Sequence, residues 1–88
     1  MYSHYLISAE QKSEIINVLE DIAFKLCQSY HKLEGEREKK LEAFIFALDD
    51  YITFLKTTRI IYNRQIELMQ LDIALRLSSL IKEKVIYG

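Results

Sequence analysis

The chain has 88 residues, 50% of them hydrophobic and 28% charged, and its formal net charge is −1. This length fits one domain near the lower limit for folding alone, and the apolar share exceeds that of disordered chains. Acidic and basic side chains are interspersed, which argues against a nucleic-acid-binding arm or a membrane-surface helix. No uncharged apolar run is long enough for a membrane span, so none is predicted.

Cysteine usage and the first residues bear on the compartment. Cys27 is the only cysteine, so an intrachain disulfide or a cysteine-based metal site is excluded. The N-terminal residues lack the basic and apolar regions of a signal peptide. We therefore expect a cytoplasmic protein, in which Cys27 behaves as a small hydrophobe buried beside Leu26.

Helix breakers are nearly missing from the sequence. There is no proline, and the two glycines are Gly35 and Gly88, so an all-α fold is predicted for a single domain over residues 1–88. Ser8 and Gln11 have the spacing of a capping box, which predicts a first helix over about residues 9–33. Gly35 is expected to follow this helix at C′ with a positive φ, and the chain to reverse there.

The second half carries apolar residues at alternating steps of four and three from Leu41 to Leu80. Taken literally, this heptad pattern predicts one long helix in a hairpin that dimerises into a bundle. A run of β-branched residues at 57–61 disfavours helix, and Asn63 can cap a new one. A break there predicts helices near 37–57 and 62–86. We prefer the resulting three-helix bundle because helices beyond about 25 residues are uncommon outside coiled coils.

Two features of the second half point to a protein partner. Arg59 and Arg76 fall in the apolar seam, where charged residues set register or partner choice unless they extend to solvent. Phe44 and Phe46 lie about 200° apart on a helix, so at least one aromatic ring is expected to be exposed. The resulting interface candidates are Phe46, Phe54, Arg59, Ile61, Leu68 and Arg76.

A short motif near the end of the first predicted helix is Tyr-His-Lys-Leu-Glu-Gly at residues 30–35. It resembles the His-x-Leu-Lys-Gly core of histidine phosphotransfer domains, which are also helical bundles. The resemblance implies that His31 accepts a phosphoryl group and that Gly35 gives access to it. Glu34 stands where that family has a lysine, and a carboxylate repels a phosphoryl group. Phosphotransfer through His31 is therefore the alternative function.

The remaining sequence shows no phosphate-binding glycine-rich loop, nucleophile elbow or Glu-x-x-His metal motif. We therefore expect no enzymatic activity, no catalytic residues, and no cofactor or metal. The preferred function is that of a small helical adaptor or regulator, which binds another protein through an apolar and aromatic helix face and forms a homodimer. Small immunity proteins and secretion co-chaperones have similar size and helical character, and they form a further alternative.

Overall fold

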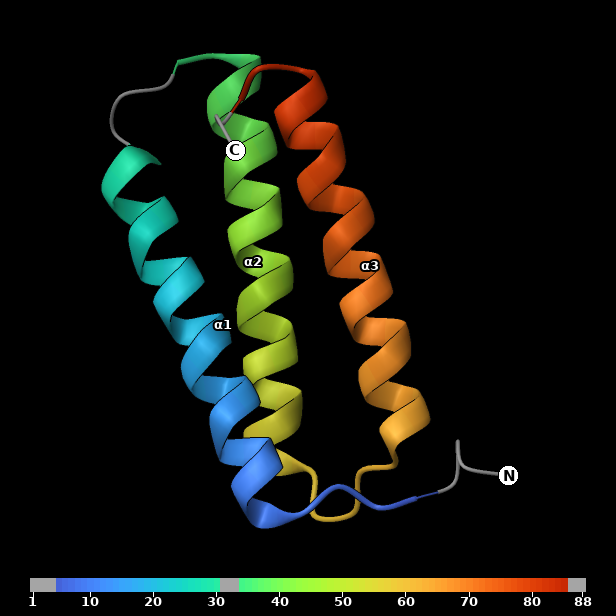
Figure 1. Cartoon of the computed structure of the whole chain (residues 1–88). Coiled ribbons are helices and arrows are strands. Elements are labelled where there is room, and N and C mark those ends of the chain that lie inside the picture. Colours follow the sequence, from blue (N-terminus) through green and yellow to red (C-terminus); the bar gives the residue numbers. More distant parts are fainter. Residues whose placement is uncertain (1–4, 31–33, 86–88) are drawn as a thin grey trace.

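The described part of the chain forms three helices of similar length. The computed structural model describes residues 5–30 and 34–85. Helix α1 spans Ala9–Tyr30, α2 spans Glu36–Thr57 and α3 spans Asn63–Lys82. Helices α1 and α3 run in the same direction, and α2 runs antiparallel to both (Figure 1). The predicted three-helix bundle is confirmed, and the long-helix alternative is wrong because α2 and α3 are separate helices.

The start of α1 has the predicted capping box. The Ser8 N–H donates to Gln11 Oε1 at 2.9 Å, and the Gln11 N–H donates to Ser8 Oγ at 3.1 Å. Two backbone N–H groups at the helix start, which have no carbonyl acceptor within the helix, thereby find hydrogen-bond partners. The helix extends to Tyr30. The predicted end of this helix at residues 31–33, which include His31, lies outside the described residues.

Gly35 has the predicted positive φ, with φ 66° and ψ −131°, and it is the N-cap residue of α2. L-amino acids avoid this region because of Cβ clashes, so glycine is suited to the position. Glu36 and Glu38 follow in the first turn of α2, where negative charge stabilises the helix dipole. Whether Gly35 also ends the preceding helix at its C′ position, as predicted, depends on residues 31–33, which lie outside the described residues.

The lower end of the bundle in Figure 1 is closed by backbone pairing between distant segments. Residues 5–7 run antiparallel to the connection between α2 and α3. The Ile7 N–H donates to the Ile61 carbonyl at 3.0 Å, and the Tyr5 carbonyl accepts from the Asn63 N–H at 2.7 Å. An isolated antiparallel bridge between Leu6 and Tyr62 is the only β-type pairing in the part of the chain that the structure describes.

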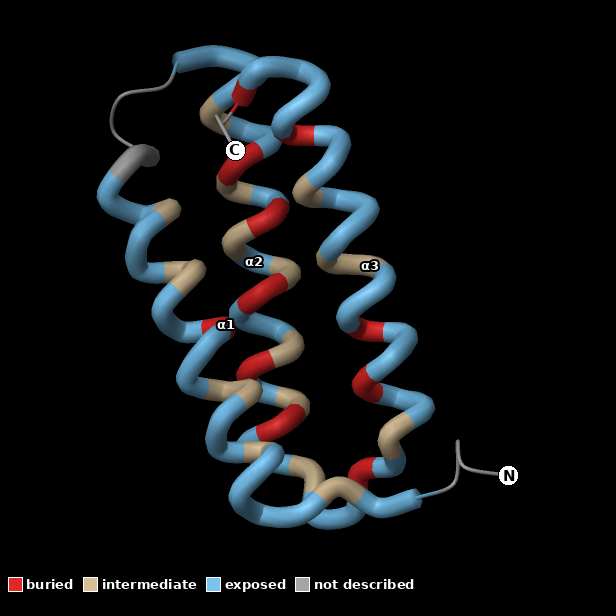
Figure 2. Tube along the Cα trace, in the orientation of Figure 1, coloured by how far each residue is buried: buried red, intermediate tan, exposed pale blue. Residues whose placement is uncertain are grey.

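Helix α2 lies at the centre of the core and packs more closely on α1 than on α3. Its residues Leu41, Leu48 and Leu55 are fully buried and repeat every seven positions, as expected for a heptad seam. Figure 2 shows buried positions along most of α2 and at intervals on α3. The other buried apolar residues are Leu19, Phe44, Ile52, Ile61, Ile66, Met69, Leu80 and Val85.

Helix α3 ends in a Schellman motif that lacks its usual glycine. The Val85 N–H donates to the Leu80 carbonyl at 2.8 Å, and the Lys84 N–H donates to the Ile81 carbonyl at 3.0 Å. Lys84 has φ 60°, the left-handed conformation that this motif requires at C′. Leu80 and Val85 are both buried, which supplies the hydrophobic contact that accompanies the motif.

Lys84→Gly is therefore expected to raise the free energy of unfolding by about 0.5–1 kcal/mol, because glycine adopts a positive φ without a Cβ penalty. Ser78→Gly, at an exposed interior position of α3, is the control and should lower it by about 0.5 kcal/mol. Urea denaturation followed by circular dichroism measures both. A stability loss in Lys84→Gly similar to that in Ser78→Gly would contradict the left-handed conformation of Lys84 at C′.

Candidate functional site

A concave feature lies between α1 and α3. Both helices pack on α2, and in the described structure no Cα atom of α1 comes within 8 Å of one in α3. The space between them is a groove of about 430 Å³, which we call the α1–α3 groove. Residues that line it include Ile15, Val18, Ile22, Gln70, Ile73 and Leu77.

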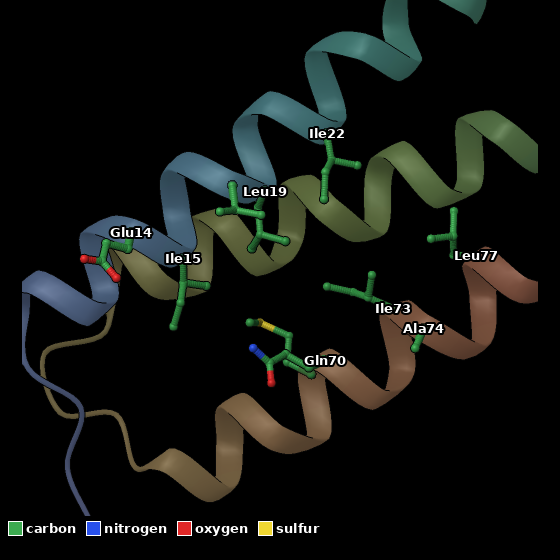
Figure 3. A pocket seen from close by; sticks show the side chains of 10 residues that line it. Glu14, Ile15, Leu19, Ile22, Gln70, Ile73, Ala74 and Leu77 are labelled. Atoms are coloured by element: carbon green, nitrogen blue, oxygen red, sulfur yellow. The ribbon is translucent and has the colours of Figure 1, made fainter. Parts of the chain in front are cut away.

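The walls of the α1–α3 groove are almost entirely apolar. Figure 3 shows Ile15 and Ile22 on α1 pointing toward the side of the groove formed by Ile73 and Leu77 on α3. Leu19 and Met69 are buried at its base, whereas Val18 is 58% exposed at its rim. Only Glu14 and Gln70 contribute polar side chains. This lining suits an apolar surface rather than a charged or polar ligand.

A second groove, of about 450 Å³, lies between α2 and α3. It brings together two of the predicted interface candidates, Phe54 and Leu68, with Met69 beneath them. Phe54 is half-buried and Leu68 is exposed. Asp50, Tyr51 and Gln65 also line this groove, which is therefore more polar than the α1–α3 groove.

Beside the second groove, a polar group links α2 to α3. The Tyr51 hydroxyl donates to Asp72 Oδ2, and Arg76 Nε donates to the same carboxylate at 3.0 Å. The hydrogen bond to Asp72 is the main cause that raises the pKa of Tyr51 above its ordinary value of 10.0. The same bond lowers the pKa of Asp72 below its ordinary value of 3.8, with Arg76 adding to the effect and burial opposing it. This cluster is a structural tie between two helices.

Tyr51→Phe is expected to lower the free energy of unfolding by about 1 kcal/mol near neutral pH, since the hydroxyl no longer binds Asp72. The Asp72 pKa is lowered on folding, so its contribution is complete above about pH 4 and is lost as pH falls through the folded value. The Tyr51 pKa is raised, so its contribution is complete below about pH 10 and is lost as pH rises through the folded value.

The stability difference between wild type and Tyr51→Phe should therefore be largest between these limits and smaller at about pH 3 and pH 11. Urea denaturation across this range measures it. Tyr5→Phe, at an exposed tyrosine, should change nothing. A difference that is independent of pH would contradict the role of the Asp72 carboxylate.

Two of the predicted interface candidates, Ile61 and Arg59, lie outside the helices and therefore not in the predicted helical stripes. Ile61 is 2% exposed, because the connection that carries it folds under the core and pairs with residues 5–7. Arg59 does not lie in a helical seam, since α2 ends at Thr57 and the chain is extended at Thr58. Arg59 is exposed on that connection.

The other predicted positions have mixed outcomes. Phe46 is 59% exposed on α2, as expected for one of the aromatic rings. Arg76 is exposed and pairs with Asp72, so it does not occupy the core. Cys27 is exposed, and its predicted burial is wrong. The proposed phosphoacceptor, His31, is outside the described residues.

Three leucines on α3 form an exposed apolar stripe, and Leu68 among them is one of the predicted interface candidates. Leu68, Leu71 and Leu75 are 50%, 57% and 63% exposed. Their spacing of three and four residues places them on one face of the helix. Ile66, Met69 and Leu80 are buried on the α2 side. Leu71 and Leu75 of this outer leucine stripe therefore face away from α2, whereas Leu68 at its edge also lines the second groove. The spacing of these leucines by three and four residues is the sequence signal that predicts such a stripe.

Within the described ranges, no group of three His, Cys, Asp or Glu residues could hold a metal ion. No helix there is long and apolar enough to cross a membrane. The chain matches no protein-family model, and no curated protein or solved structure is significantly similar to it. Its function is therefore inferred from the grooves and the exposed apolar side chains.

Proposed function

We propose that the protein is a non-enzymatic interaction module that binds an amphipathic helix in the α1–α3 groove. The observation that carries this proposal is the apolar groove between two helices that run in the same direction and whose Cα atoms stay more than 8 Å apart. A helix laid along this groove would occupy the position of a fourth helix in a bundle. Its apolar side chains would then be buried between α1 and α3.

The lining supports a helix rather than an extended peptide. An extended peptide binds mainly by adding backbone hydrogen bonds at a sheet edge, and the described structure has no sheet. Backbone groups of a helix are already paired with one another, so a helix can be recognised by apolar side chains alone. Only two polar side chains, Glu14 and Gln70, line the α1–α3 groove. Binding would therefore depend mainly on its apolar side chains.

The proposed location is the cytoplasm. Cys27 is a free, exposed thiol, and unpaired thiols persist where the compartment is reducing. The near-neutral charge of the chain also favours a protein partner over nucleic acid.

A photoreactive phenylalanine analogue placed at Gln70 tests this proposal in cells of the native host. We expect it to be crosslinked to a peptide that mass spectrometry identifies as an amphipathic helical segment. The matched control carries the analogue at Phe46, which is exposed on α2 and was predicted from the sequence as an interface residue. Absence of adducts at Gln70, or adducts only at Phe46, would overturn the proposal.

A further inference from the structure

We propose that the antiparallel pairing of residues 5–7 with residues 61–63, which we call the N-terminal clasp, is a latch that sets the width of the α1–α3 groove. While the clasp is closed, it holds the base of α3 beside the base of α1. When residues 5–7 are released, the base of α3 moves away from α1 as a rigid helix and the groove widens. This inference goes beyond the proposed function, because it concerns the groove itself and not its occupant.

The clasp directly links the two walls of the groove at the lower end of the bundle (Figure 1). Residues 5–7 lead into α1, and Asn63 is the first residue of α3. The Ile7 N–H donates to the Ile61 carbonyl, and the Asn63 N–H donates to the Tyr5 carbonyl. Among the described residues, no other Cα atoms of α1 and α3 approach within 8 Å, and no hydrogen bond or ion pair joins the two helices. Above the clasp, their spacing therefore depends on packing.

Each wall of the groove begins with a hydrogen-bonded cap of its own. Ser8 and Gln11 cap α1. At the start of α3, the Tyr62 N–H donates to Gln65 Oε1 at 2.8 Å, and the Gln65 N–H donates to the Tyr62 carbonyl at 3.0 Å. Neither cap uses the hydrogen bonds of the clasp, so both helix starts keep their partners when the clasp opens. The two walls therefore move as whole helices.

Few interactions hold the clasp closed. Besides its two backbone hydrogen bonds, Lys12 Nζ on α1 donates to the Thr58 carbonyl at 2.8 Å. Leu6 and Tyr62 on its outer face are exposed, whereas Ile61 on its inner face is buried. Two short paired strands are not stable in water by themselves. Opening of the clasp should therefore need less free energy than unfolding of the helical core.

Helix α3 is the wall that moves, because α2 packs more closely on α1 than on α3. The far end of α3 is held on α2 by the buried Leu80, and Glu83 beyond it pairs with Lys40 at 2.9 Å. At the base, Asn63 Oδ1 is buried without a hydrogen-bond partner among the described residues, and such an atom lowers the stability of the closed state. Release of the clasp should therefore move the base of α3 and leave its far end in place.

Burial of apolar side chains near the base explains why the structure has the clasp closed. Ile61, Ile66 and Met69 are all buried at this end of the bundle. Opening exposes part of this apolar surface to water, which is unfavourable. The open state is therefore a minor population in the wild type, and its share rises when the clasp is weakened.

Distances between two spin labels, measured by pulsed electron paramagnetic resonance on the full chain, test the latch. One label pair reports on the basal half of the groove and is attached at Ser13→Cys and Leu71→Cys in a Cys27→Ser background. A second pair, at the native Cys27 and at Ser78→Cys, reports on the far half. All four label positions are exposed.

Ile7→Pro breaks the latch, because proline has no N–H to donate to the Ile61 carbonyl. We expect the basal distance to lengthen by about 5 Å or more, the spacing of two paired strands, while the far distance stays the same. Leu6→Pro is the matched control. Leu6 and Tyr62 form a non-hydrogen-bonded pair, so the Leu6 N–H points away from the connection. This variant should leave both distances unchanged.

Lys12→Met removes only the contact with Thr58 and should lengthen the basal distance by a smaller amount. Circular dichroism should show the wild-type helix content in every variant. An unchanged basal distance in Ile7→Pro, equal lengthening at both ends, the same lengthening in Leu6→Pro, or loss of helix content in Ile7→Pro would each overturn the inference. No partner is added in these measurements, so their outcome is independent of the proposed function.

Discussion

Phe44→Ala is expected to lower the free energy of unfolding by about 3–5 kcal/mol. Phe44 is 2% exposed in the core, so the substitution removes a large apolar side chain and leaves a cavity. A domain of 88 residues has a total stability of roughly 4–13 kcal/mol. The variant should therefore be near its unfolding threshold, with a Tm lowered by about 15–30 °C. Urea denaturation and a thermal melt, both followed by circular dichroism, measure the loss.

Phe46→Ala is the matched control, because it removes the same side chain from the same helix two residues away. Phe46 is 59% exposed, and its loss should change stability by no more than about 0.5 kcal/mol. Equal losses in the two variants would mean that Phe46 is covered in solution. That result would contradict its exposed position on α2 and would restore it as an interface candidate.

The helices could be predicted because they depend on local chemistry, although the N-cap of α3 is Tyr62 and not the predicted Asn63. The capping box at Ser8 and Gln11 is decided within four residues, and the structure contains both of its hydrogen bonds. The β-branched run before Asn63 disfavours helix over a similarly short distance. Such features leave a clear signal in the sequence. The three elements accordingly agree with the predicted ones to within a few residues wherever the chain is described.

Burial of single residues could not be predicted with the same success, because it depends on contacts between distant segments. The heptad pattern continues through Arg59 and nearby Ile61, but the chain leaves the helix there. Ile61 is then buried by its pairing with residues 5–7. Cys27 is a similar case, since it neighbours the half-buried Leu26 but lies on the exposed side of α1.

The α1–α3 groove was visible in the sequence only as an excess of apolar residues. A wide apolar stripe on α1, with Ile15, Val18 and Ile22, is compatible with a closed bundle as well as an open one. The groove exists because α1 and α3 both pack on α2 while no Cα atom of one comes within 8 Å of a Cα atom of the other. That separation is set by how three helices pack, which no local pattern encodes.

Met69→Glu is expected to lower the free energy of unfolding by about 3 kcal/mol or more, because a carboxylate is placed in an apolar environment. Met69 is 5% exposed and lies at the base of both grooves, where it helps to hold α3 on α2. Since α2 packs more closely on α1 than on α3, the loss should fall mainly on α3. Hydrogen exchange measured by mass spectrometry should show the largest decrease in protection across Asn63–Lys82.

Two controls separate charge from volume and position in this experiment. Met69→Leu keeps an apolar side chain of similar size and should cost less than about 1.5 kcal/mol. Gln70→Glu adds the same charge at the next residue, which is exposed, and should change stability by no more than about 0.5 kcal/mol. If protection falls equally in all three helices, α3 is not the weaker part and the bundle opens as one unit. If it falls only in α3, the helix that carries the outer leucine stripe is also the one most easily released from α2.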